Sequence, residues 1–424
     1  MKKNIVGIKN SIKSISFLWL GSIIGSGSTF IISIVLGKKL GPEQFGVFFS
    51  AQSTITVFVL ISSFGVSQAW LKLFGKEGNK GLRWVKPSLK LILLMLLVTT
   101  FLIVFWSFFG PHTLETRYVL LIMIFYLYGK INIELVSSKL QIAEKYLSLA
   151  IWQLIPNVSR LFMLLIFIYA LNGLLSPIKI SIIYGIVGII VSIVGIYHLI
   201  KFKNFNSIEI KKRPKVSEIL KESWPFGFGS LFAFIYVQSD IIMVKYISGD
   251  TQAGYYNAAF IFLSAIYILP STLYQKYLMP KFHKWANYNR KKFYSVYIIG
   301  NKIMLVFGII IMMVVLLTSK YFVPLFFGEK YNESIFLLNI LALNLPFYLI
   351  AFSAASVLVT QDNMRRKVKY MGIVAILNII LNLILIPKYN ARGAAIATLI
   401  SNATLLLIYL YATKKYVFIE TNDK

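Results

Sequence analysis

Twelve apolar stretches, each long enough to cross a lipid bilayer as a helix, occupy most of the 424 residues. A bilayer core of roughly 30 Å requires about 20 predominantly apolar residues in a helix. Because short polar connections separate the stretches, the pattern predicts an all-α integral membrane protein with twelve transmembrane helices. The predicted spans are 15–36, 45–71, 88–109, 118–138, 147–171, 178–200, 224–247, 254–278, 296–318, 334–359, 368–386 and 391–412.

Basic residues alternate in abundance from one connection to the next. Counting Lys90, Lys179, Lys276, Lys369 and Arg392, which lie at span ends, with the adjoining connections, 32 of the 44 Lys and Arg residues fall in the two termini and the even-numbered connections. Eight fall in the odd-numbered connections. Short loops that are rich in Lys and Arg stay on the cytoplasmic side of a membrane. We therefore expect both termini to be cytoplasmic.

The net charge of +29 indicates the membrane surface rather than nucleic acid. Nucleic-acid binding requires a concentrated basic face, whereas these charges are dispersed over seven short segments, which favours contact with anionic lipid headgroups. The chain has no cysteine, which excludes disulfides, thiol catalysis and thiolate metal sites. The first apolar run is too long for the core of a cleavable signal peptide, so we expect none.

The longest hydrophilic connection, 201–223, divides the chain into two halves of six spans. We expect an N-terminal bundle (1–205), a basic cytoplasmic linker (206–217) and a C-terminal bundle (218–424). A short repeat supports this division. The segments LGKKLGPEQFGVFFSA (36–51) and VKYISGDTQAGYYNAA (244–259) align Gly41 with Gly249, Gln44 with Gln252, Gly46 with Gly254 and Ala51 with Ala259, and they place Phe48 opposite Tyr256.

Both halves begin on the same side of the membrane because each has an even number of spans. Such repeats are related by a pseudo-two-fold axis along the membrane normal, and they enclose a central cavity in transporters that work by alternating access. A static scaffold built from two duplicated bundles is the alternative.

Ionisable side chains inside the spans are candidates for function because they are costly at membrane depth. Apart from the basic residues counted with the connections, the spans contain Lys130, Glu134, Arg160, Asp240, Lys245 and Lys302. Arg160 lies near mid-membrane after Pro156 and Asn157, where a guanidinium can hold a phosphate through paired donors. The alternative is a structural contact with an acid or with carbonyls at the proline break. Lys130 is expected to pair with Glu134 one turn away and to add charge to the cavity.

A second polar set comes from the C-terminal half. Asp240, the paired amides Asn378 and Asn382, and Thr398 offer hard oxygen ligands for Na⁺, and a buried carboxylate can equally exchange H⁺. Hydrogen bonding between helices is the structural alternative. Prolines Pro156, Pro270 and Pro346 predict helix kinks.

Three segments resemble one transporter family. LGKKLGPEQFGVF (36–48), DIIMVKYISGDTQAGYYNAA (240–259) and NIILNLILIPKYNARGAAIATLIS (378–401) are similar to Wzx-type oligosaccharide flippases. These belong to the polysaccharide-transport branch of the multidrug/oligosaccharidyl-lipid/polysaccharide exporter superfamily. The resemblance extends over the whole chain in length and topology.

The resemblance implies a carrier in the bacterial cytoplasmic (inner) membrane. Its substrate would be a polyprenyl-pyrophosphate-linked oligosaccharide for O-antigen (lipopolysaccharide) or capsule assembly, and a polymerase is a candidate partner. The family's cationic cavity maps by position onto Arg160 and Lys130, with Asn157 beside them. Its relatives bind a coupling cation, Na⁺ or H⁺, where Asp240, Asn378, Asn382 and Thr398 lie, although Asn382 stands where a second acid is expected.

Two other functions remain to be separated from this one. A cation-coupled multidrug exporter of the same superfamily requires an acidic cavity, whereas the spans, without the basic residues counted with the connections, contain four basic and two acidic residues. A membrane glycosyltransferase, polymerase or ligase requires a catalytic constellation and usually a large outer loop. Because the sequence has neither, we expect no enzyme activity and no bound cofactor.

Overall fold

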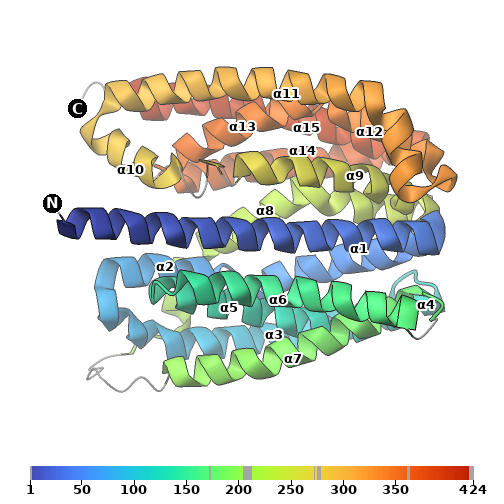
Figure 1. The fold of residues 1–424 in the computed structure, drawn as a ribbon, viewed down its shortest axis with the longest axis horizontal. Helices are drawn as coiled ribbons and strands as arrows, with labels where there is room; N and C mark the ends of the chain where they lie inside the picture. The colour runs from blue at the N-terminus through green and yellow to red at the C-terminus, as the bar shows by residue number, and fades with distance from the viewer. Residues whose placement is uncertain are drawn as a thin grey trace. The chain divides into compact units, whose positions relative to one another are not determined.

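The computed structural model describes residues 2–170, 173–203, 213–271, 273–274, 278–360 and 363–419, with side chains from Leu20 onward except at positions 203, 269, 271, 280, 283 and 287. The described residues are mainly helical (Figure 1) and contain no strand. Eight helical stretches among them are long and apolar enough to cross a membrane, or nine if one bent pair forms a single span. The all-α membrane class is confirmed, and the number of twelve spans stays a prediction.

The chain forms two compact units, Met1–Ser33 with Ala51–Leu231, and Ile34–Ser50 with Phe232–Lys424. The predicted linker lies partly outside the described residues, at 206–212, and the division at 206–217 stays a prediction. Predicted spans 147–171 and 254–278 also end or pass outside the described residues.

The first unit contains most of α1 and the helices up to the start of α8. Their bounds are α1 Lys2–Ser63, α2 Val66–Glu77, η1 Gly78–Trp84, α3 Val85–Phe109, α4 Leu114–Ile122, α5 Ile124–Ile142, α6 Tyr146–Leu165, the π-turn η2 Ile166–Ala170, α7 Pro177–Lys203 and α8 Val216–Ser248. Helix α5 packs along α7, and α6 contacts both, as Figure 1 shows.

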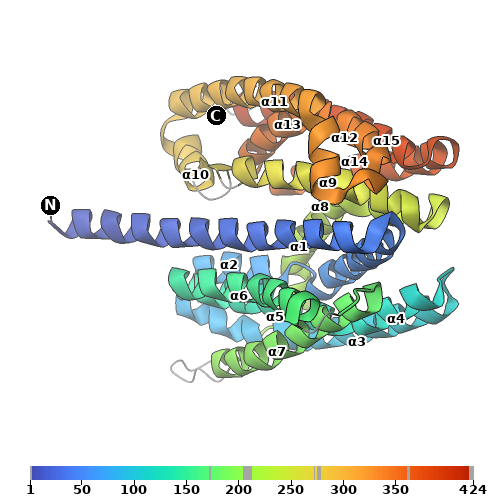
Figure 2. The ribbon, with the colours of Figure 1, turned by 45° about the vertical axis from the view of Figure 1, so that its right-hand side comes forward.

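The second unit contains the rest of α8 and all later helices. Their bounds are α9 Asp250–Ser271, α10 Met279–Tyr288, α11 Arg290–Phe327, η4 Glu329–Tyr331, α12 Asn332–Ala342, α13 Leu345–Leu358, α14 Met364–Tyr389, α15 Ala391–Ala412 and the π-turn η5 Thr413–Ile419. Helix α13 packs between α11 and α15, and α14 packs along α15 (Figure 2).

The two halves of the repeat contact each other inside the second unit. Gly41 and Gly249 both adopt positive φ, 74° and 91°, a conformation that glycine accepts without strain. A Cβ on Gly46 would lie 1.8 Å from the carbonyl oxygen of Asp250, and one on Gly254 would lie 1.9 Å from that of Pro42. The contact is reciprocal because Pro42 and Asp250 occupy equivalent repeat positions. Only glycine permits so close an approach of the two backbones.

The predicted prolines differ in their effects. Pro346 stands in the first turn of α13, directly after a 47° bend between α12 and α13, so the predicted kink is confirmed there. Pro156 lies inside α6 and Pro270 inside α9 without interrupting either helix.

Candidate functional site

Arg160 is a buried cation in the first unit. It projects from α6, and its side chain is 5% exposed. The guanidinium carbon lies 5.0 Å from the ring centre of Tyr126 on α5 and 4.8 Å from that of Tyr184 on α7. The two tyrosine rings therefore hold a guanidinium away from lipid, and a desolvated contact of this kind contributes about 2 kcal/mol.

The described surroundings of Arg160 contain no neutralising acid. Its Nη1 donates to Oδ1 of Asn157, one turn earlier, at 3.2 Å, while its buried Nε has no hydrogen-bond partner. No carboxylate within the described residues lies within ion-pair distance of it. Neither structural alternative, a paired acid or a carbonyl at the proline break, is found there. The guanidinium therefore has no described acid as a partner, and its Nε–H remains available to a ligand.

Lys130 joins this cluster from α5. Its Nζ lies 5.5 Å from the ring centre of Tyr126, so Tyr126 contacts both predicted cations. No ion pair within 4 Å connects Lys130 with Glu134, although the charge of Lys130 still acts on the Glu134 carboxyl group. Helical spacing put them on one face but did not fix the direction of two long side chains.

The sequence interpretation missed the aromatic members of the cluster. Tyr126 precedes Lys130 by one helical turn, which was a usable signal, whereas Tyr184 comes from another helix. Gln52 of α1 donates from Nε2 to the Tyr126 hydroxyl at 3.5 Å. Gln52 is followed by a serine and a threonine in the sequence, which marks a polar stretch, but only the fold shows that its partner is Tyr126.

The second polar cluster centres on Asp240 of α8, which is fully buried. Asn382 of α14 donates to Oδ1 at 2.6 Å, and Tyr256 of α9 donates to Oδ2 at 2.6 Å. Thr398 of α15 is hydrogen-bonded to Oδ2 as well. Four helices thus meet at one carboxylate, and three of the four predicted ion-site residues are in direct contact.

Asn378 completes the predicted set. Its Oδ1 accepts from Nδ2 of Asn382 at 3.1 Å and from Ser239 at 3.4 Å, while its own Nδ2 and the Oδ1 of Asn382 are buried without partners. Rotation of either side-chain amide by half a turn would interchange its oxygen and its nitrogen, so that each amide can present either an acceptor or a donor to the cluster. The site therefore contains unused hydrogen-bonding capacity beside the carboxylate.

No cation within the described chain neutralises Asp240. The neighbouring lysine on α8, Lys245, pairs instead with Asp250 at 2.8 Å. A carboxylate in this setting can accept a proton or, with amide and hydroxyl oxygens turned inward, a small hard cation. The described residues contain no cluster of three or more His, Cys, Asp or Glu residues that would suit a transition metal.

Tyr256 is the member of this cluster that the sequence interpretation missed. Its hydroxyl also lies 3.3 Å from Oγ1 of Thr398. The repeat alignment had placed Tyr256 opposite Phe48, which has no hydroxyl, so the repeat itself gave no signal of a polar role.

Comparison with known proteins agrees with this architecture. Residues 11–285 match the family described as polysaccharide biosynthesis protein. The capsular polysaccharide biosynthesis protein CapF of Staphylococcus aureus is 22% identical over 95% of this chain and 99% of its own length.

Two solved structures have a similar fold. The lipid II flippase MurJ in an inward closed conformation matches with a TM-score of 0.71 at 20% identity, over 95% of this chain and 88% of the other. An outward-facing multidrug resistance MATE family transporter matches with a TM-score of 0.68 at 15% identity, over 97% of both chains.

The sequence resemblance is thereby confirmed at the level of the family. The apolar helices and the membrane relatives also confirm a multi-pass protein of the cytoplasmic (inner) membrane. The chain belongs to the polysaccharide biosynthesis protein family and has the fold of transporters of the multidrug/oligosaccharidyl-lipid/polysaccharide exporter superfamily.

Proposed function

We propose that this protein is a flippase that moves polyprenyl-pyrophosphate-linked oligosaccharides from the cytoplasmic to the outer leaflet. The products would serve O-antigen or capsule assembly. The observation that carries the proposal is Arg160, a buried guanidinium that no described carboxylate neutralises. The family and the flippase fold support it.

Arg160 would bind the pyrophosphate. A buried cation is costly unless it is paired, so an anionic ligand would contribute the charge that the described surroundings lack. The rings of Tyr126 and Tyr184 fix the plane of the guanidinium, which favours paired hydrogen bonds to phosphate oxygens. Lys130 would add a second positive charge, and Asn157 would orient Arg160 from its other side.

Asp240 would couple transport to an ion gradient. Binding of H⁺ or Na⁺ at the carboxylate, with Asn378, Asn382 and Thr398 as neighbours, would neutralise the buried charge. Because the ligands come from α8, α14 and α15, ion binding would change how these helices pack. The ion would thereby bias one step of the transport cycle.

The membrane arrangement follows from the sequence. Twelve spans would form bundles 1–205 and 218–424, related by pseudo-two-fold symmetry about the membrane normal, with both termini in the cytoplasm. Rocking of these bundles would expose the headgroup alternately to each side, while the polyprenyl tail stays in lipid. A polymerase would then receive the exported unit.

Surface polysaccharide in a bacterium that lacks its own flippase tests the proposal. Wild type is expected to restore export, whereas Arg160→Ala and Asp240→Asn should reduce it by tenfold or more at equal membrane abundance. Arg160→Lys should restore little, because an ammonium cannot form the paired contacts of a guanidinium. Arg117→Ala is the matched control. Arg117 lies in the first turn of α4 and, like Arg160, places its guanidinium over an aromatic ring, in this case that of Phe108. Normal export by Arg160→Ala would remove Arg160 from the mechanism.

The multidrug exporter is the second candidate function, and the likeness to a MATE transporter favours it. An organic cation would be repelled by Arg160 and Lys130, which is why we rank this candidate second. Accumulation of a fluorescent organic cation in the same cells separates the two. Reduced accumulation on expression of wild type, together with unrestored polysaccharide, would favour the drug exporter.

A further inference from the structure

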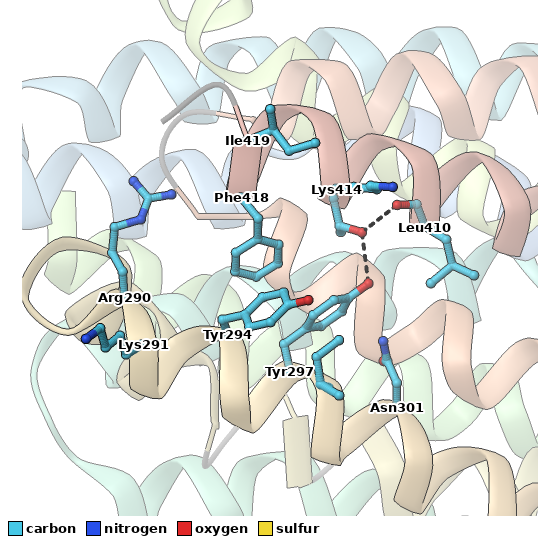
Figure 3. Close-up of a pocket in the computed structure, with 11 residues that line it drawn as sticks. Arg290, Lys291, Tyr294, Tyr297, Asn301, Leu410, Lys414, Phe418 and Ile419 are labelled. Atoms are coloured by element: carbon cyan, nitrogen blue, oxygen red, sulfur yellow. Dashed lines mark hydrogen bonds between the residues drawn. The ribbon is translucent and has the colours of Figure 1, made fainter. Parts of the chain in front are cut away.

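A separate cavity of about 650 Å³ lies in the second unit, where α11 begins and α15 passes into η5 (Figure 3). It shares no lining residue with the Arg160 or Asp240 clusters. One wall is the first three turns of α11, and the other is the segment from Leu410 to Ile419.

The walls of this cavity are held together by aromatic packing. The Phe418 ring lies 5.2 Å from that of Tyr297, stacked, and 5.0 Å from that of Tyr294, edge to face. The Tyr297 hydroxyl is hydrogen-bonded to Oγ1 of Thr413 at 2.9 Å. These contacts connect α11 to η5, so the cavity is part of the packed fold rather than a gap between loose segments (Figure 3).

Three cations line the cavity, and none of its described wall residues is acidic. Arg290 donates from Nη2 to the carbonyl oxygen of Val417 at 2.5 Å, which fixes the guanidinium at the start of α11. Lys291 and Lys414 are exposed, and no ion pair within the described residues involves either side chain. The described part of the cavity therefore has a net positive charge.

Polarity changes along the cavity from one end to the other. Arg290 and Asn301 are separated by about 16 Å along α11, at 1.5 Å per residue. The predicted membrane spans begin at 296 and end at 412, so the three cations lie at the depth of lipid headgroups. Ile298 and Leu410 line the part that lies within the hydrocarbon.

We propose that this cavity binds an anionic membrane phospholipid, with its phosphate against Arg290, Lys291 and Lys414. One acyl chain would follow Ile298 and Leu410 toward the membrane interior. Basic pockets between transmembrane helices on the cytoplasmic side suit such headgroups. Free phosphate has the same anionic chemistry but leaves the apolar end unfilled. The proposal does not depend on the transported substrate.

Lipid retention by the purified full-length protein tests this inference. The protein is exchanged into detergent with a fixed ratio of phosphatidylglycerol and phosphatidylcholine, and bound lipids are counted by native mass spectrometry. We expect one phosphatidylglycerol to be retained in preference to phosphatidylcholine. In the double variant Lys291→Gln/Lys414→Gln that preference should fall by fivefold or more, and Lys291→Arg/Lys414→Arg should keep it.

The matched control is Lys320→Gln/Lys330→Gln, which removes one exposed charge in the C-terminal part of α11 and one in η4 directly after it. Unchanged retention in this control, with equal elution profiles for all variants, supports a local site. An equal loss in the control, or equal retention of both lipids by wild type, would overturn the proposal. Displacement of the lipid by millimolar inorganic phosphate would also overturn the proposal, because it would indicate a site for a soluble anion. A stronger preference for polyprenyl phosphate would overturn it as well, because it would indicate a substrate site.

Discussion

At the scale of single residues, the two polar clusters stabilise opposite charges by different means. Arg160 is held by the faces of two tyrosine rings and one amide. Asp240 is held by hydroxyl and amide groups from three other helices. Neither charge has an opposite charge as a described partner, which is why we propose an anion as the ligand of the first cluster and a cation as the ligand of the second.

Tyr256→Phe is expected to impair ion coupling while leaving the fold intact. The substitution removes the hydroxyl that donates to Asp240 at 2.6 Å and keeps the buried ring. Hydrogen bonds to charged groups contribute about 1.5–3 kcal/mol, so the ion concentration for half-maximal transport should change by about tenfold or more. Transport by protein reconstituted in vesicles, titrated with Na⁺ and with H⁺, measures this.

The neighbouring substitution Tyr255→Phe is the control for Tyr256→Phe. The Tyr255 ring contacts Tyr331 at 6.2 Å, and this contact survives removal of the hydroxyl. Equal ion dependence in both variants would contradict a role for the Tyr256 hydroxyl in coupling.

Residues whose chemistry is rare inside a membrane were predictable, and residues whose chemistry is common were not. Arg160, Asp240 and Asn382 were found because charged and amide groups are conspicuous in apolar spans. Tyr126, Tyr184 and Tyr256 were missed because the chain has 25 tyrosines, and only tertiary packing distinguishes these three from the rest.

At the scale of elements, α1 shows why helix boundaries were harder to predict than apolar stretches. Two separate spans were expected, at 15–36 and 45–71. The run labelled α1 consists of two helices that meet at a kink at Gly41, whose backbone is non-helical (φ 74°, ψ 171°), and the second helix ends at Ser63. Pro42 supplies no amide hydrogen and suits the first turn after the break. The predicted polar connection therefore contains the kink between the two helices, whereas the helix end at Ser63, inside the predicted span 45–71, was not expected.

The contact between Gly46 and Gly254 is expected to tolerate no side chain. In Gly46→Ala the new methyl group would meet backbone, the Asp250 carbonyl oxygen, at 1.8 Å. Overpacking of a well-packed contact costs roughly 1–3 kcal/mol, and rigid backbone partners raise that cost. We predict a lower yield of folded protein and a lower temperature of aggregation in detergent, with Gly254→Ala behaving alike.

Gly27→Ala in α1 is the matched control for Gly46→Ala, because a Cβ there would meet nothing within 4 Å. Alanine also favours the helical state over glycine by about 1 kcal/mol. The control should be neutral or slightly stabilising. A Gly46→Ala protein as stable as Gly27→Ala would show that the two repeat segments do not pack as described.

At the scale of the whole molecule, the orientation in the membrane is the prediction that rests most on sequence and least on packing. Compact units follow from contacts between helices, whereas the side of the membrane on which a loop lies depends on charge. The excess of basic residues on alternate connections predicts that 72–87 faces the cytoplasm and 319–333 faces outward. Neither assignment depends on the proposed substrate.

Single cysteines can test that orientation directly, because the chain contains none of its own. In intact cells, a membrane-impermeant maleimide should label Glu329→Cys, in the short turn η4 before α12, and should not label Asn79→Cys, in η1. Permeabilisation should make both react to a similar extent, which controls for burial of either thiol. Labelling of Asn79→Cys alone in intact cells would invert the topology. An inverted topology would place the cations of the α11 cavity at the outer surface and would reverse the proposed direction of transport.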